Sequence, residues 1–298
     1  MAINPDHLLT FVRVARLGNL SAAAEELNLT QPAVSNQIKL LTQAVGEPLL
    51  VRHRYGVRLT SAGEGLLPYA VAASRALEGA RQYAADLHGL DLGTLTIAAS
   101  STIAATILPS VLALYHARFP NVSLHVQQGN TQEVMNLLLA QKCELVLIEG
   151  PVSALPIDLN EQVFRRDTLR LVMSPGHPLA VRTSLSPDDL TGLGVVWREP
   201  GSGTREVAKL ALERAGVQTR EVLTLTGTEA VKEAVMTGLG VAFLSELSVR
   251  RDMEAGRLVS PVLTLSGLKR DLRIVSAKPE LLSRAAQMVL ALLHQQSL

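Results

Sequence analysis

The sequence predicts an α/β protein in three parts: an N-terminal winged helix-turn-helix, one long dimerisation helix, and a two-lobed α/β domain. Three observations predict this organisation. Residues 20–40 carry two short helical patterns around a tight turn, and a basic hairpin follows them. Residues 60–87 keep a helical apolar repeat throughout. From residue 94 onward, short apolar strands alternate with helices, which is the pattern of an α/β fold.

The first helix of the helix-turn-helix is predicted to begin at Ser21, because a serine hydroxyl can cap the free N–H groups of a helix start. Its apolar residues Ala24 and Leu27 are expected to face inward. Asn28 and Leu29 form the turn, and Leu29 is expected to join the core.

The second helix is predicted to begin after Thr30, whose hydroxyl can cap it. Pro32 lies in its first turn, where a missing N–H costs nothing. Val34, Ile38 and Leu41 recur at spacings of four and three, so they mark the buried stripe.

The opposite face of this helix is polar. Short amide and hydroxyl side chains at a helix start suit base edges in a major groove, so Gln31, Ser35 and Asn36 are predicted to face bases. Lys39 and the arginines of the hairpin at residues 46–60 are predicted to face phosphate or a minor groove. Those arginines are Arg52, Arg54 and Arg58. The alternative is a surface helix pair without DNA, since this geometry also occurs in enzymes.

This N-terminal region resembles the LysR-type transcriptional regulators, a family of DNA-binding proteins. The matching stretches are residues 8–12, 21–24, 30–35, 37–38, 40, 46–49 and 59–63. They cover about the first 65 residues, and Pro32 and Ala33 of the motif join the expected DNA-binding residues. Asn36 stands where the family commonly has arginine, which leaves one base or phosphate contact open. Leu50 stands where phenylalanine is common, which is a tolerated core substitution.

Composition limits the remaining possibilities. The net charge of the 298-residue chain is only +1, so DNA affinity must come from a local basic patch. The single cysteine, Cys143, lies in an apolar run and is expected to be a buried structural thiol. No signal segment or membrane-spanning run is found, so a cytoplasmic protein is expected. The histidines have no metal-ligand spacing, and neither a dinucleotide fingerprint nor a nucleophile elbow is present; no catalytic residue, cofactor or metal is expected.

The long helix at residues 60–87 is predicted to be capped by Thr60 and to pack against the same helix of a second subunit. Packing on its own winged module is the alternative. The resemblance implies a homodimer, and tetramers through the effector domains. Residues 88–93 break the helix and have the composition of a hinge. The predicted domains are therefore 1–60, 61–88 and 93–298.

The C-terminal part is predicted to be a parallel α/β layout with two lobes. Strands are expected at residues 94–99, 122–126, 145–148, 169–173, 194–197, 222–225, 241–244 and 273–276. Helices are expected at 103–119, 131–140, 186–190, 204–215, 228–237 and 280–294. Two such lobes joined by two crossings form a clamshell with a ligand cleft, similar to periplasmic solute-binding folds and to the effector domain of the same family. Lobe I is expected at about 93–165 and 269–298, and lobe II at about 166–268.

Hydroxyl-rich loops follow the strands that end at this cleft. Ser100, Ser101 and Thr102 open one helix, residues 197–205 open another, and residues 226–228 open a third. Hydroxyls, free N–H groups and arginines at helix starts suit an anion. The predicted effector-binding residues are Ser100, Ser101, Thr102, Gln128, Arg198, Ser202, Gly203, Thr204, Arg205 and Thr228. Glu149 borders the cleft, where it either repels or orients ligands or is a solvated loop carboxylate.

The string at residues 198–205 is similar to the branch of the family that includes regulators of carbon fixation and of sulfur assimilation. That similarity implies a small inorganic or phosphorylated anion as effector. The sequence therefore predicts a transcription regulator that binds double-stranded operator DNA and a small anion, with no membrane partner. The alternative is a solute-binding or enzymatic clamshell whose N-terminal helices only dimerise it.

Overall fold

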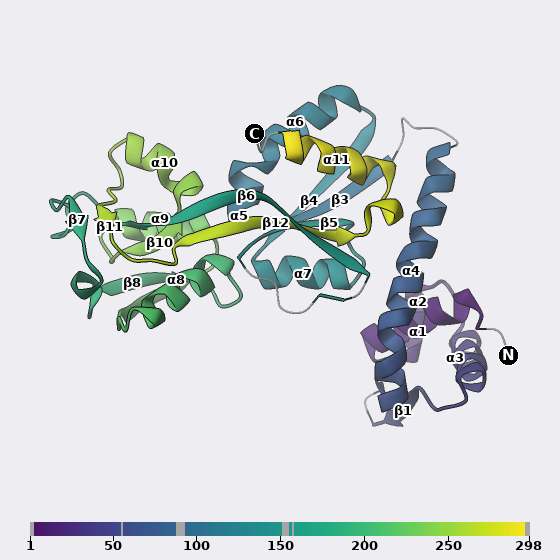
Figure 1. Ribbon diagram of the computed structural model, residues 1–298. Coiled ribbons are helices and arrows are strands. Elements are labelled where there is room, and N and C mark those ends of the chain that lie inside the picture. The colour runs from purple at the N-terminus through teal and green to yellow at the C-terminus, as the bar shows by residue number, and fades with distance from the viewer. Residues whose placement is uncertain (1–2, 55, 88–92, 151–154, 157, 296–298) are drawn as a thin grey trace. The chain divides into compact units, whose positions relative to one another are not determined.

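The computed structural model describes residues 3–54, 56–87, 93–150, 155–156 and 158–295. Its contacts divide the chain into two compact units, each of which is described by itself. The first comprises Met1–Gly89 with the segments Pro156–Leu159 and Ala277–Ser283. The second comprises the remaining residues and holds the α/β domain (Figure 1).

The first unit is a winged helix-turn-helix followed by a long helix. Its elements are α1 (Pro5–Leu17), α2 (Leu20–Glu26), α3 (Gln31–Val45), β1 (Leu50–His53), β2 (Gly56–Leu59) and α4 (Ser61–Leu87). The predicted stripe of Val34, Ile38 and Leu41 is buried, and it packs with Phe11 and Leu49 in one core. This burial fixes α3 in the module and leaves its opposite face exposed.

Helix capping follows the prediction at α3 and differs from it at α2. Thr30 Oγ1 accepts a hydrogen bond from the Ala33 N–H at 3.4 Å, as predicted. Asn19, not Ser21, caps α2, because the helix already begins at Leu20 and the Asn19 carboxamide accepts from the Ser21 N–H at 2.8 Å. The expected burial of Leu29 is also wrong, since Leu29 is 40% exposed. Left-handed Asn28, at φ 53°, turns the chain after Leu27, which packs against the core instead.

The helix α4 packs against its own unit along one face. Its first part places Leu66, Leu67 and Ala70 against the core of the winged module. Further along, the buried Arg75 forms an ion pair with Asp158. A Cβ at Gly79 would lie 2.7 Å from the Leu281 carbonyl oxygen, so glycine permits this close approach. The Thr60 cap is as predicted, with a 3.0 Å bond from the Gly63 N–H, and the expected hinge falls largely on residues 88–92, outside the described residues.

The second unit is built on one mixed sheet with the strand order β10-β6-β12-β5-β3-β4. The strands are β3 (Gly93–Ser100), β4 (Val122–Gly129), β5 (Leu145–Glu149), β6 (Leu159–Val172), β10 (Ala242–Ser245) and β12 (Lys269–Ala277). β3 pairs in parallel with β4 and β5, but β12 pairs antiparallel with β5, and β10 antiparallel with β6. The predicted parallel layout is therefore confirmed for β3, β4 and β5 and is wrong where β12 and β10 join the sheet. The long strands β6 and β12 are the two crossings between the lobes (Figure 1).

The remaining elements flank this sheet and build the second lobe. They are α5 (Ser101–Thr106), α6 (Leu108–Arg118), α7 (Thr131–Leu139), β7 (Ser184–Leu185), a 3₁₀ turn at Pro187–Leu190, β8 (Gly194–Arg198), α8 (Gly203–Arg214), β9 (Arg220–Leu225), α9 (Thr228–Met236), α10 (Glu246–Glu254), β11 (Val262–Leu263), a 3₁₀ turn at Pro279–Leu281 and α11 (Arg284–Gln295). The expected helix over 103–119 is two helices that meet at Ile107, because Pro109 cannot continue a helix. The expected helix over 280–294 is likewise a 3₁₀ turn and then α11.

Each lobe has its own apolar packing. Every residue of β5 is buried, and Cys143 just before it is buried as predicted. In the second lobe, Trp197 stacks on Phe243 with ring centroids 6.1 Å apart. Among the described helices, none combines the length and the hydropathy needed to cross a membrane.

Candidate effector site and DNA-reading surface

Three helices of the second unit start at the junction of the two lobes without a side-chain cap. Ser100 precedes α5, Ser202 precedes α8 and Gly227 precedes α9, and none of them caps its helix with a side-chain hydrogen bond. By contrast, α3, α7 and α10 all carry side-chain caps. The first-turn N–H groups of the junction helices are therefore donors that no N-cap side chain accepts from.

Buried hydroxyls line the same three helix starts. The residues are Ser100, Ser101, Thr102, Ser202, Thr204 and Thr228, and each is at most 7% exposed. Thr102 Oγ1 lies close enough to Glu149 to contribute to its lowered pKa, but it meets the geometry of no hydrogen bond among the described residues. Since a buried hydroxyl without a partner costs free energy, Thr102 is the group at this junction that most needs a ligand.

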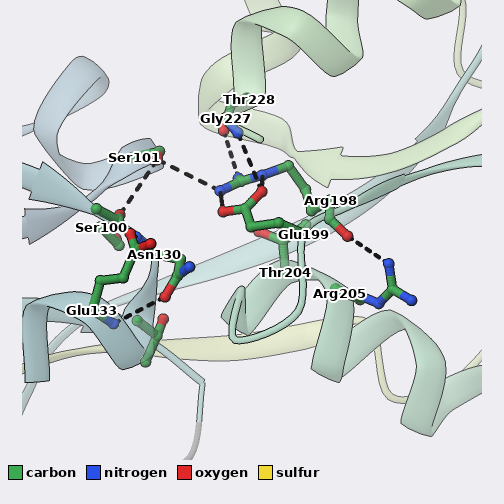
Figure 2. Close-up of polar contacts among 12 residues, drawn as sticks. Ser100, Ser101, Asn130, Glu133, Arg198, Glu199, Thr204, Arg205, Gly227 and Thr228 are labelled. Atoms are coloured by element: carbon green, nitrogen blue, oxygen red, sulfur yellow. Dashed lines mark hydrogen bonds and ion pairs between the residues drawn. The ribbon is translucent and has the colours of Figure 1, made fainter. Parts of the chain in front are cut away.

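Arg198 connects the lobes at the end of β8 (Figure 2). Its guanidinium donates to the carboxylate of Glu199 through Nε at 2.8 Å and Nη2 at 2.7 Å. It also donates to Thr228 Oγ1 at 2.8 Å and, more weakly, to Ser101 Oγ at 3.5 Å. The predicted residues Ser101, Arg198 and Thr228 are thus brought together, but the arginine charge is already paired.

Glu199 is an internal anion at the start of α9. Its Oε2 accepts a 3.1 Å hydrogen bond from the Gly227 N–H. Partial burial raises the pKa of Glu199, but the bonds and charge of Arg198 and the Gly227 N–H outweigh that effect and lower it. Glu199 therefore holds a negative charge where a helix start favours one.

Glu149, at the end of β5, is a second internal carboxylate and is only 2% exposed. The alternative of a solvated loop carboxylate is therefore wrong. Its Oε1 accepts from Ser100 Oγ at 2.9 Å, and its Oε2 accepts from Thr204 Oγ1 at 3.1 Å and from Arg270 Nη1 at 2.8 Å. Burial raises the pKa of Glu149, and the charge of Arg270 with the Ser100 hydroxyl brings it below its usual value.

The partners of Glu149 extend along the crossing strands. Arg270 on β12 also donates from Nε to Asp167 Oδ2 of β6 at 2.8 Å, and Ser245 Oγ donates to Asp167 Oδ1 at 2.9 Å. No pattern in the sequence indicates Arg270 or Asp167 as site residues. Each lies in a strand outside the hydroxyl-rich loops, and only the pairing of β5 and β12 shows that Arg270 reaches Glu149.

Two predicted effector residues, Arg205 and Gln128, form no hydrogen bond to the buried hydroxyls among the described residues. Arg205 donates to the Arg198 carbonyl oxygen at 2.7 Å, to Thr224 Oγ1 at 3.1 Å and to Glu221 Oε2 at 3.2 Å. Its guanidinium points away from Ser101 (Figure 2). Gln128 is exposed on the edge strand β4, opposite Ala99.

Gly203 permits the lobes to approach each other. A Cβ on Gly203 would lie 2.3 Å from the Glu149 carbonyl oxygen and 3.0 Å from Thr131 Oγ1. Any side chain at this position would push α8 away from β5. The role of Gly203 is therefore close backbone approach, as the glycine-rich loop suggested.

The predicted DNA-reading residues lie on α3 and on the wing of the first unit. Gln31, Pro32, Asn36 and Lys39 are exposed on α3, whereas Ala33 and Ser35 are half-buried. The wing arginines divide between two faces, because Arg58 pairs across the hairpin with Val51, and Arg52 with Val57. Paired residues share a face and neighbours alternate, so Arg52 and Arg58 point to opposite sides.

These features define a class of protein: a helix-turn-helix regulator with a two-lobed ligand-binding domain. The bacterial regulatory helix-turn-helix model of the lysR family matches residues 5–64, and the LysR substrate binding domain model matches residues 88–297. The chain belongs to the LysR family of transcriptional regulators.

Named relatives agree with this assignment. The HTH-type transcriptional activator CmpR of Synechocystis is 33% identical, over 93% of this chain and 90% of that protein. The RuBisCO operon transcriptional regulator of Allochromatium vinosum is 32% identical, over 87% and 85%. These relatives are regulators and not enzymes.

Solved structures share the fold. ArgP from Mycobacterium tuberculosis superposes with a TM-score of 0.74 at 22% identity and covers all of this chain and 98% of its own. The regulatory domain of CcmR from Synechocystis, in complex with 2-PG, has a TM-score of 0.64 at 24% identity and covers 69% of this chain and 97% of its own.

Proposed function

We propose that this regulator binds a small anion between the lobes and that the anion changes its affinity for operator DNA. The observation that carries the proposal is the convergence of three uncapped helix starts and their buried hydroxyls at one junction. Such a junction supplies N–H and O–H donors in a site of low dielectric, where charge-assisted bonds are strong.

The ion pairs at the junction limit the chemical class of the ligand. Arg198 is bound to Glu199, and Arg270 is bound to Glu149 and Asp167, so both of these described arginines already have a carboxylate partner. A ligand would therefore meet neutral N–H and O–H donors and could use an arginine only by taking it from its carboxylate, which favours a compact oxyanion such as sulfate, phosphate or a small phosphorylated acid. The fold shared with CcmR, whose regulatory domain was solved with 2-PG, supports 2-PG as the first probe.

Glu199 indicates how such an anion would change the hydrogen bonds between the lobes. Its carboxylate accepts from the Gly227 N–H and from Arg198, which are the donors that an oxyanion would use at the start of α9. An anion that replaces Glu199 there would accept the hydrogen bonds of the Arg198 guanidinium, which also contacts Ser101. The set of bonds between the lobes would then differ between the free and bound forms. A ligand can shift the population of a DNA-binding state only if it binds that state with a different affinity from the other state.

On the DNA side, the proposal assigns Gln31, Ser35 and Asn36 of α3 to base edges. Lys39, Arg52, Arg54 and Arg58 are assigned to the phosphate backbone or minor groove. The family assignment supports binding to a paired site by a homodimer, and we extend this to tetramers formed through the effector domains.

The unpartnered Thr102 hydroxyl gives the sharpest test. Thr102→Val keeps the shape of the side chain and removes the hydroxyl, so we expect about tenfold weaker binding of sulfate, phosphate or 2-PG in calorimetric titrations of the full chain. The unliganded variant should melt at nearly the same temperature, because the hydroxyl meets the geometry of no hydrogen bond and loses only its weaker contact with Glu149. Thr183→Val, at an exposed threonine, is the matched control. Unchanged anion binding together with a lower melting temperature would assign Thr102 to structure alone.

A further inference from the structure

A basic hollow lies on the second unit outside the junction of the helix starts. Its volume is about 330 Å³, and it is lined by Arg165, Arg166, Asp167, Thr168, Glu246, Leu247, Arg250 and Lys269. These residues belong to the crossing strands β6 and β12 and to the first turns of α10. The volume is in the range that holds a small metabolite.

The positive charges of this hollow are largely uncompensated. Arg165, Arg250 and Lys269 are exposed and form no ion pair with any described residue. Arg166 is 90% exposed, and its one ion pair within the described part of the chain is with Asp271, at 3.9 Å. Like charges held together repel one another, so this arrangement costs free energy in the empty protein.

The two acidic groups of the hollow do not neutralise these cations, because both have partners of their own. Asp167 is bound to Arg270, with Nη2 of the arginine 2.7 Å from Oδ2 of the aspartate. Glu246 pairs with Arg170, with Nη2 2.9 Å from Oε1. The hollow therefore keeps a local excess of positive charge in a chain whose net charge is only +1.

We propose that this hollow is a second anion-binding site, which takes a small metabolite with two or more negative charges. Guanidinium groups bind phosphate and carboxylate oxygens in pairs, so Arg165 and Arg250 suit separate oxyanion groups of one ligand. The site differs in kind from the junction of the helix starts. It attracts ligands by unpaired charge, whereas the arginines described at the junction are already paired with carboxylates.

One buried network connects the two places. Asp167 lines the hollow and binds Arg270, and Arg270 Nη1 donates to Glu149 Oε2 at 2.8 Å and to Thr204 Oγ1 at 2.9 Å. An anion in the hollow would act on the same arginine that anchors the junction. Binding at one place is then expected to change affinity at the other, and by the same factor in both directions.

Calorimetric titration of the full chain with inorganic pyrophosphate and with citrate, at constant ionic strength, tests this proposal. We expect Arg250→Gln with Lys269→Gln to weaken binding about tenfold, from two exposed ionic contacts. Arg251→Gln is the matched control, since Arg251 is exposed on the same helix but does not line the hollow. Thr102→Val tests binding at the junction. If Thr102→Val weakens anion binding and the double variant does not, this proposal fails while the proposed effector site stands.

Binding that is equal in the double variant and in Arg251→Gln would overturn the proposal. So would the failure of both probes to bind the unmodified chain. Raising the salt concentration should weaken binding to the hollow more than binding at the junction, because exposed cations are screened more strongly.

Discussion

Arg270 Nη1 lies 2.8 Å from Glu149 Oε2, and both side chains are almost fully buried. The contact joins the crossing strand β12 to the end of β5, and Thr204 at the start of α8 bonds to both residues. Glu149 therefore ties one lobe to the other through charged hydrogen bonds. The negative charge of Glu149 is needed for this, because Arg270 would otherwise keep only Asp167 as its counter-ion.

Low pH should remove the stabilisation that the ionised Glu149 contributes through Arg270. A carboxyl with a lowered pKa stabilises the fold above its usual pKa of about 4.3, and the stabilisation is lost as pH falls through the lower folded value. We expect Glu149→Gln to lower the free energy of unfolding by about 3 kcal/mol at pH 7. The difference in the free energy of unfolding between Glu149→Gln and the unmodified protein should stay constant down to about pH 4.3 and become smaller below it. Urea unfolding followed by the fluorescence of Trp197, the single tryptophan, measures both.

Glu206→Gln is the control for this substitution, because Glu206 is exposed on α8 and the change should cost less than about 0.5 kcal/mol. A loss in Glu149→Gln that stays the same over the whole pH range would show that folding does not lower the pKa of Glu149, and a loss that grows as pH falls below about 4.3 would show that the folded protein raises it.

The polar face of α3 should read sequence. Replacing Ser35 or Asn36 by alanine is expected to change the preferred site, at about 1–3 kcal/mol for each lost base contact. Gel shifts on the DNA upstream of the gene, with single-base variants of the bound site, measure this. Gln43→Ala, at an exposed position near the end of α3, should leave preference unchanged. If both alanine variants retain affinity and preference, another element reads the bases.

The dimer seam should use the exposed face of α4. Leu66 packs on the winged module, so charging it would damage that core and not test the seam. Tyr69 is 69% exposed, and Ala73 follows one turn later on the same face. We expect Tyr69→Glu with Ala73→Glu to dissociate the dimer in sedimentation experiments, while Gln43→Glu does not. An unchanged sedimentation coefficient in the double variant would place the seam elsewhere.

The sequence predicted the parts that depend on local pattern. The stripe of Val34, Ile38 and Leu41 and the Thr30 cap follow from helical spacing and helix-start chemistry. The hydroxyl loops also lie where strands were expected to end. The sequence could not show which charged residues, far apart along the chain, form ion pairs with each other.

Charge pairing is a tertiary property, and it changed the interpretation of the site. Glu199 is adjacent to Arg198 in sequence, yet only the fold shows that it spans the arginine and the start of α9. Arg270 reaches Glu149 over a sequence separation of 121 residues, which no local pattern reveals. The mixed sheet was missed for the same reason, because strand direction depends on where β6 and β12 cross between lobes.

We propose above that a small anion between the lobes controls DNA binding. The most direct measurement is the affinity of the full-length chain for the DNA upstream of its gene, with and without 2-PG, phosphate or sulfate. We predict that at least one anion that binds the chain changes this affinity about 5- to 150-fold, and that Thr102→Val shifts the response to higher anion concentration. An affinity that stays the same at saturation with every anion that binds would contradict the account.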